Sequence, residues 1–144
     1  MNENAALFFV DRHVDSHINE KKAFIEYGSK QKFITYADLY EQSSKLRHFF
    51  SKFKINREDR VIILMQDVIS YPIIFWGCLK SGVIPVLLNT LLSSEVVNEI
   101  INNSRAKAVF ISSRLLSSFE NSVKKNVSIK HIIEVGTKKS NYIN

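Results

Sequence analysis

The sequence predicts an α/β fold, in which a parallel sheet with flanking helices is built from βαβ units and preceded by a small β-hairpin. Short apolar runs of strand length alternate with helical patterns, and they recur at a spacing of roughly 20 to 25 residues, the period of βαβ units. The run at residues 61–65 is apolar throughout, as expected of a strand buried on both faces. A composition of 45% hydrophobic and 24% charged residues is that of a globular domain.

The front of the chain is expected to fold before the parallel sheet begins. Residues 23–27 and 32–35 resemble two strands of a hairpin around Gly28. Thr35 can cap a helix that begins at Tyr36, and Asp38 three residues later completes an Asp variant of the capping box. The helix would bury one face, which carries Leu39, Leu46, Phe50 and Phe53.

The first βαβ unit begins with the strand at residues 61–65. Ser70 is then predicted to cap a helix whose first turn tolerates Pro72. Residues 73–79 are apolar nearly all round, so this helix should be deeply packed. Lys80 suits the negative end of the helix, and Gly82 suits the position just past that end.

The same pattern then repeats along the rest of the chain. Residues 83–88 form a predicted strand, in which Pro85 cannot donate a ladder hydrogen bond. Ser93 or Ser94 can cap the next helix, and further strands are expected at residues 108–111 and 129–135. Two helical faces are predicted between these strands, one with Val96, Val97, Ile100 and Ile101, the other with Leu115, Leu116, Phe119 and Val123.

The charge is unevenly distributed. The chain has 20 Lys+Arg and 14 Asp+Glu, a net charge of +6, and residues 100–144 hold 8 basic and 2 acidic side chains. Such an excess can bind nucleic acid or an anionic surface, but no aromatic residues are interleaved with the lysines, so a solvated face is favoured. No apolar run is long enough to span a membrane. We therefore expect a cytoplasmic protein without a nucleic-acid or membrane partner.

Few residues indicate catalysis. The single cysteine, Cys78, lies in an apolar run and is expected to be a buried hydrophobe. His13 and His17 have the spacing of a helical metal pair but lack a third ligand nearby, so no metal site is expected. Asp67 follows the first parallel strand and is expected to cap a helix. No glycine-rich phosphate loop is present, and no catalytic residue is assigned.

Two segments resemble core motifs of the adenylate-forming superfamily, which includes acyl-CoA synthetases, luciferases and peptide-synthetase adenylation domains. The stretch ITYADL resembles the first motif, with Thr35, Tyr36 and Leu39 at its defining positions. The stretch LKSGVIPV resembles the second, and the matching residues are Lys80, Gly82 and Pro85. Residues 4–12 and 89–92 are most similar to benzoate–CoA ligases.

This resemblance implies that residues 1–144 form the N-terminal portion of an AMP-binding domain, a partial adenylate-forming domain without its phosphate-loop region and C-terminal lid domain. The complete enzyme would use ATP, Mg²⁺ and CoA to convert an aromatic carboxylate such as benzoate into an acyl-adenylate and then a thioester. None of these would be bound by this chain alone, which is expected to be inactive, with scaffold roles for the matched motif residues. Thr90 and Leu91 would lie at the rim of the CoA channel.

The implied partner is the remainder of the enzyme or a complementary chain. The alternative is a non-catalytic split or regulatory subunit that docks onto a partner carrying the remaining motifs. In either case, fragment or subunit, the chain should expose an apolar face where the missing part would pack.

Overall fold

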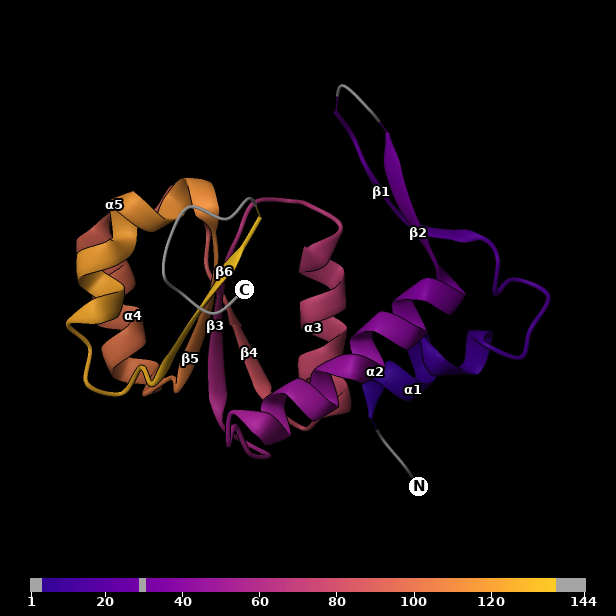
Figure 1. The fold of residues 1–144 in the computed structure, drawn as a ribbon, viewed down its shortest axis with the longest axis horizontal. Helices are drawn as coiled ribbons and strands as arrows, with labels where there is room; N and C mark the ends of the chain where they lie inside the picture. The colour runs from indigo at the N-terminus through magenta and orange to yellow at the C-terminus, as the bar shows by residue number, and fades with distance from the viewer. Residues whose placement is uncertain (1–3, 29–30, 137–144) are drawn as a thin grey trace. The chain divides into compact units, whose positions relative to one another are not determined.

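The computed structural model describes residues 4–28 and 31–136, and the chain divides into two compact units (Figure 1). The first unit falls within Met1–Asn56 and Asp67–Val83. The second falls within Arg57–Gln66 and Ile84–Asn144.

The first unit is a hairpin with helices. Its antiparallel strands pair from Lys22 opposite Thr35 to Glu26 opposite Lys32, which confirms the predicted hairpin. The elements of this unit are α1 (Ala5–Phe9), the 3₁₀ helix η1 (Asp11–His13), β1 (Lys22–Glu26), β2 (Lys32–Thr35), α2 (Tyr36–Lys52) and α3 (Ser70–Lys80).

Helix α2 begins as the sequence predicts. The Thr35 hydroxyl accepts a hydrogen bond from the Asp38 amide at 3.1 Å, and the Asp38 carboxylate accepts one from the Thr35 amide at 3.1 Å. This reciprocal pair is a capping box, which satisfies two backbone donors at the start of the helix. Leu39 and Phe50 are buried on one face of α2, so capping and apolar periodicity specify the same helix.

Helix α3 ends as predicted but begins differently. Gly82 has φ +70°, its amide donates to the Leu79 carbonyl, and the Val83 amide donates to that of Cys78, which is a Schellman motif. Ser70, however, does not cap the helix: it is the first helical residue. Ile69 occupies the cap position with helical φ and ψ, so the chain enters α3 without an extended capping residue.

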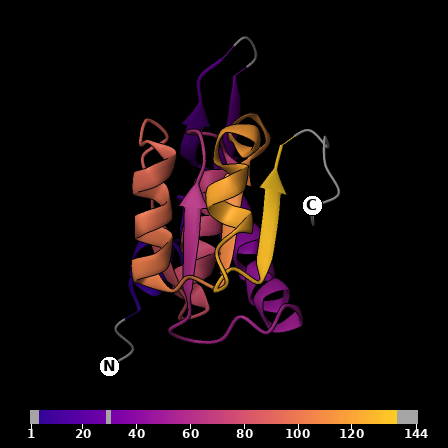
Figure 2. The ribbon, with the colours of Figure 1, turned by 90° about the vertical axis from the view of Figure 1, so that its left-hand side faces the viewer.

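The second unit contains a four-stranded parallel sheet in the order β4–β3–β5–β6, which confirms the predicted α/β class. Figure 2 shows the arrows of β3 and β6 pointing in the same direction. The elements are β3 (Arg60–Leu64), β4 (Ile84–Leu87), α4 (Ser94–Ser104), β5 (Ala108–Ser112), α5 (Ser113–Lys124) and β6 (His131–Val135). Strand β6 begins after a turn in which the Ile129 amide donates to the Asn126 carbonyl.

Helices α4 and α5 cover one face of this sheet (Figure 1). Alternate residues of the central strands, including Ile62 and Val109, point into a core that the two helices close. The helices contribute the predicted apolar faces, whose buried members are Val97, Ile101, Leu116, Phe119 and Val123. Ser93, rather than Ser94, caps α4 through a hydrogen bond from the Val96 amide.

Pro85 lies in β4, at an edge of the sheet. The Ile84 amide donates to the Asp59 carbonyl, just before β3, and the Leu88 amide donates to the Ile63 carbonyl of β3. Because amide directions alternate along a strand, the nitrogen of Pro85 faces the other side, where no β3 acceptor has to be satisfied. The edge position therefore accommodates a proline within a parallel strand.

Candidate functional site

The carboxyl ends of the four strands form the candidate ligand edge of the second unit. The strand order changes direction at β3, because β4 lies on one side of β3 and the later strand β5 lies on the other. In open α/β sheets, ligands bind outside the carboxyl ends of the strands at such a topological switch point. The relevant segments are therefore those that follow β3, β4, β5 and β6.

The switch point itself is closed by a hydrogen bond. The Gln66 amide, just after β3, donates to the Ser112 hydroxyl at the end of β5 over 3.0 Å. Next to it, the Ser113 hydroxyl donates to the Val135 carbonyl of β6 at 3.3 Å. Both serine hydroxyls thus bind backbone groups. They hold strand ends together, and this use is structural.

Gly136 is required at the end of β6. Its φ is +129°, a region that side chains rarely adopt, and a Cβ at this position would lie 2.9 Å from the Ser113 Oγ. A glycine at the end of β6 therefore has a physical reason, because any other residue would be strained and would crowd Ser113. At the ends of β5 and β6, the Gly136 backbone and the Ser113 side chain therefore lie in close contact.

The predicted CoA-rim residues lie in the loop that follows β4. At the start of this loop the Leu88 amide donates a hydrogen bond to the Ile63 carbonyl, and at its end Leu92 packs against the core. Between them, the Leu91 amide donates to the Asn89 side-chain oxygen at 2.8 Å. Leu91 is 90% exposed and Thr90 is half-buried. This loop offers apolar and backbone contacts at the ligand edge, and a leucine cannot pair with a phosphate.

The start of α3 in the first unit is held by a residue that sequence reasoning missed. The Glu26 carboxylate on β1 accepts a hydrogen bond from the Ile69 amide at 2.8 Å and forms an ion pair with Lys32 at 3.5 Å. The backbone bond holds the pKa of Glu26 below its ordinary value, and Lys32 adds to this effect. An anion at this position also suits the positive end of the helix.

Asp67 does not perform the capping role expected of it. Its side chain is exposed, and the cap position of α3 belongs to Ile69, without a capping side chain of its own. Burial raises the pKa of the Tyr71 hydroxyl, and the negative charge of Asp67 raises it further. The carboxylate that satisfies the helix start comes from Glu26, 43 residues before Ile69 in the chain.

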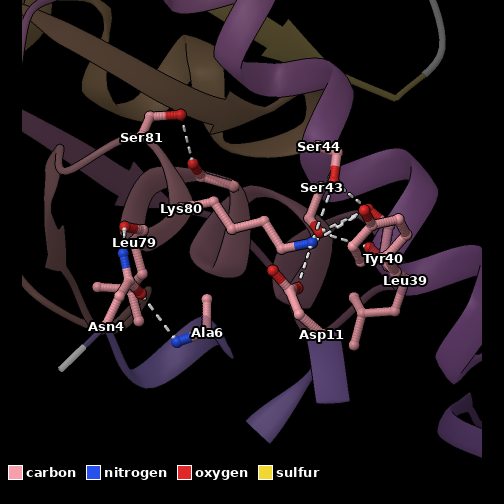
Figure 3. A network of polar contacts seen from close by, with 11 residues as sticks. Asn4, Ala6, Asp11, Leu39, Tyr40, Ser43, Ser44, Leu79, Lys80 and Ser81 are labelled. Carbon is pink, nitrogen blue, oxygen red and sulfur yellow. Dashed lines mark hydrogen bonds and ion pairs between the residues drawn. The ribbon is translucent and has the colours of Figure 1, made fainter. Parts of the chain in front are cut away.

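Lys80, from the second matched motif, is the centre of a polar network in the first unit (Figure 3). Its Nζ lies 2.7 Å from Asp11 Oδ1 and donates to the Tyr40 carbonyl and the Ser44 hydroxyl at 3.2 and 3.1 Å. The side chain is only 8% exposed. Burial lowers the pKa of Lys80, and the bond to Asp11 opposes that shift. Lys80 therefore joins α3 to α2 and to η1.

The termini of α1 and α3 are joined by neighbouring contacts in the same view (Figure 3). The Asn4 side-chain amide donates to the Leu79 carbonyl at 2.8 Å, while its oxygen accepts from the Ala6 amide at 2.9 Å. The Ser81 hydroxyl donates to the Gly77 carbonyl at 2.8 Å. These bonds satisfy backbone groups at helix ends, which makes the motif residues around Lys80 part of the scaffold.

The described residues contain no group of three His, Cys, Asp or Glu side chains that could hold a metal ion. Cys78 is buried, and burial raises the pKa of its thiol to about 12, so it is not a nucleophile at neutral pH. His13 packs edge-on against the Tyr36 ring at 4.7 Å between centroids. Within the same part of the chain, no helix has both the length and the apolar character needed to cross a bilayer.

Comparison with known proteins identifies a family match. The family model described as AMP-binding enzyme matches residues 10–142. A 4-hydroxybenzoate–CoA/benzoate–CoA ligase of Rhodopseudomonas palustris is 32% identical over 92% of the chain, and a long-chain-fatty-acid–CoA ligase of Haemophilus influenzae is 31% identical over 85%. The chain spans only 24% and 21% of the lengths of these relatives.

Solved structures show the same fold. A benzoate CoA ligase from Burkholderia xenovorans superposes with a TM-score of 0.82 at 24% identity, covering 92% of this chain and 26% of that one. An anthranilate CoA ligase superposes with a TM-score of 0.87 at 20% identity, covering 96% of this chain and 26% of that one. At these identities the likeness establishes the architecture of the matched segment.

Proposed function

Because the chain belongs to the AMP-binding enzyme family, we propose that it forms the opening part of an acid–CoA ligase for an aromatic carboxylate such as benzoate. The observation that carries this proposal is the 32% identity with the benzoate-activating relative over 92% of the chain. Such a ligase joins the carboxylate to AMP with release of pyrophosphate from ATP. The CoA thiol then displaces AMP to give the thioester.

In this proposal, residues 1–144 supply scaffold and one rim of the ligand edge. The capping box at Thr35 and the network around Lys80 use the matched motifs to start and join helices of the first unit. The sequence has four glycines, and none forms a phosphate-binding loop. We therefore infer that the phosphate-loop region and the lid domain belong to polypeptide outside this chain, and that the chain alone is inactive.

The substrates of the proposed enzyme are the acid, ATP with Mg²⁺, and CoA. Of these, we assign CoA to the loop holding Thr90 and Leu91. The exposed Leu91 side chain suits the methyl groups of the pantetheine arm of CoA and the backbone beside it suits the amides of that arm, while the diphosphate would need cations from elsewhere. We place the enzyme in the cytoplasm and take the remainder of the ligase as its partner. No observation favours the alternative of a regulatory subunit.

A segment exchange tests the proposal. The segment of the R. palustris ligase that matches this chain is replaced by residues 10–142, and the same replacement is made in the H. influenzae ligase. We expect the first chimera to keep benzoate-dependent ATP–pyrophosphate exchange and the second to lose most of its palmitate-dependent exchange. The reverse result would refute the aromatic assignment. Acid-dependent exchange catalysed by the 144-residue chain alone would refute the scaffold role.

A further inference from the structure

The hairpin of the first unit has two different faces. Phe24 pairs with Ile34 and Glu26 with Lys32, so these four side chains share one face. Ile25 pairs with Phe33, and this pair lies on the opposite face. Because side chains alternate along each strand, the two sets cannot exchange places without a shift in register.

The first of these faces is already used within the unit. Ile34 is 2% exposed and packs in a cluster with Val10 and Leu39. Glu26, on the same face, binds the Ile69 amide at the start of α3. These contacts fix the hairpin onto the helices of the first unit and settle which face points inward.

The second face is apolar and exposed. Ile25 is 53% exposed and Phe33 is 51% exposed, and Tyr27, two residues after Ile25, is 96% exposed. We call these three residues the outer hairpin face. The Lys22 Nζ lies 4.5 Å from the centre of the Phe33 ring, which adds a positive charge at the border.

An outer face of this kind is unusual for a hairpin that stands alone. Two strands are marginally stable in water, and a third strand or a packed layer normally covers them. β-branched and aromatic residues such as Ile25 and Phe33 are those that pack well against a covering layer. The sheet of β1 and β2 has two strands among the described residues, so neither has a further strand beside it there.

We propose that the outer hairpin face is the docking surface for the remaining polypeptide of the ligase, and this inference rests on the proposed function. The occupant is an apolar segment of that polypeptide, with a carboxylate that reaches Lys22. The length of the relatives supports this choice, since the chain spans 24% of the R. palustris ligase and most of such an enzyme lies outside it. A second copy of this chain fits poorly, because it would bring its own Lys22, with the same positive charge, to a face whose border already carries Lys22.

Reconstitution from two chains tests the proposal. The 144-residue chain is mixed with a second chain that carries the R. palustris ligase without its matched segment. Binding is measured by titration, and amide hydrogen exchange is followed over Lys22–Glu26 and β2 in the free and mixed chain. We expect binding to slow exchange in the hairpin, and Ile25→Thr/Phe33→Thr to weaken binding at least about tenfold, as expected for two buried anchors.

Threonine suits a strand, so the double variant should keep the hairpin, which circular dichroism and the melting temperature check. Val127→Thr is the matched control, because Val127 is an exposed aliphatic residue in the other unit, and it should leave binding unchanged. Lys22→Glu is a second variant that removes the charge pairing without altering the apolar pair, and it should also weaken binding.

The outcomes separate docking from function. Binding without hairpin protection, binding unaffected by the hairpin variants, no binding at all, or dimerisation of the chain through the hairpin would each overturn the docking surface. Hairpin-dependent binding that restores benzoate-dependent pyrophosphate exchange would support both proposals. Hairpin-dependent binding that restores no benzoate-dependent pyrophosphate exchange would support the docking surface and count against the proposed function.

Discussion

Replacement of Gly77 by alanine should destabilise the chain, although alanine is the better helix former. Gly77 lies in α3 where the helix meets α2. A Cβ added to Gly77 would lie 2.7 Å from the Leu46 Cβ and 2.8 Å from its Cγ and Cδ1. Carbon atoms normally pack at about 3.5–4.0 Å, so the two helices would have to separate by roughly 1 Å. The Leu46 Cβ is fixed to the backbone, and a change of rotamer cannot move it.

Two opposing effects set the magnitude. Alanine in place of glycine stabilises a helix interior by about 1 kcal/mol. Overpacking of a close contact costs about 1–3 kcal/mol, and the short distance to a backbone-fixed atom places this case at the upper end. We expect a net loss of about 1–2 kcal/mol in the free energy of unfolding.

Urea unfolding of the full chain, followed by far-UV circular dichroism, measures this loss. Gly28→Ala is the matched control, because no atom lies within 4 Å of a Cβ at Gly28, and it should be near neutral. In a Leu46→Ala background, which removes the Cγ and Cδ1 contacts, Gly77→Ala should cost less than in the wild type. A Gly77→Ala variant as stable as the wild type, or more stable, would refute the close approach of α2 and α3.

Three further predictions concern single residues of the first unit. Thr35→Ala should lower the free energy of unfolding by about 1 kcal/mol through loss of the capping box, and Thr35→Ser should restore most of it; equal urea midpoints for Thr35→Ala and wild type would contradict this. Because the folded-state pKa of Glu26 lies below its ordinary 4.5, its ionised form stabilises the fold at neutral pH, and this contribution is lost as the pH falls below about 4.5 through the folded-state pKa. Glu26→Gln should therefore be less stable than wild type at pH 7, with a gap that narrows in acid; a gap independent of pH would argue against the carboxylate cap. With the pKa of Cys78 raised from 9.0 to about 12, alkylation by iodoacetamide at pH 8 should be roughly a thousandfold slower in the native chain than in urea, and equal rates would show that the thiol is not buried.

Features that depend on neighbouring residues in the chain were predictable. The capping box joins residues three apart, and Gly82 terminates α3 through contacts within one turn, so both could be identified from local chemistry. The apolar faces of α4 and α5 were also predictable, because a helix repeats every 3.6 residues whatever it packs against. The predictions for Ser70 and Asp67 were wrong, because the helix start is satisfied by Glu26 from a distant strand.

The candidate site likewise has parts that local sequence patterns predict and parts that depend on distant contacts. Residues 89–92 could be placed after a parallel strand from the alternation of elements. The switch point could not, because the order β4–β3–β5–β6 depends on which strands pair in space. The hydrogen bond that closes the switch point joins the Gln66 amide to the Ser112 hydroxyl. These two residues are far apart in the sequence, so no local pattern predicts that they meet. The role of Thr90 and Leu91 at a CoA channel stays a prediction.

The amino-acid order alone thus determined the α/β class, most helix and strand positions, and the motifs that mark the family, because these depend on local periodicity and capping. Only the tertiary structure decided which distant polar groups meet: Lys80 with Asp11, and Glu26 with the Ile69 amide. It also decided that the hairpin face with Ile25 and Phe33 is the exposed one. Such contacts depend on the free energy of bringing remote segments together, which local propensity does not encode. The net charge of +6, the most visible feature of the composition, depends on no such contact and indicated nothing specific about function.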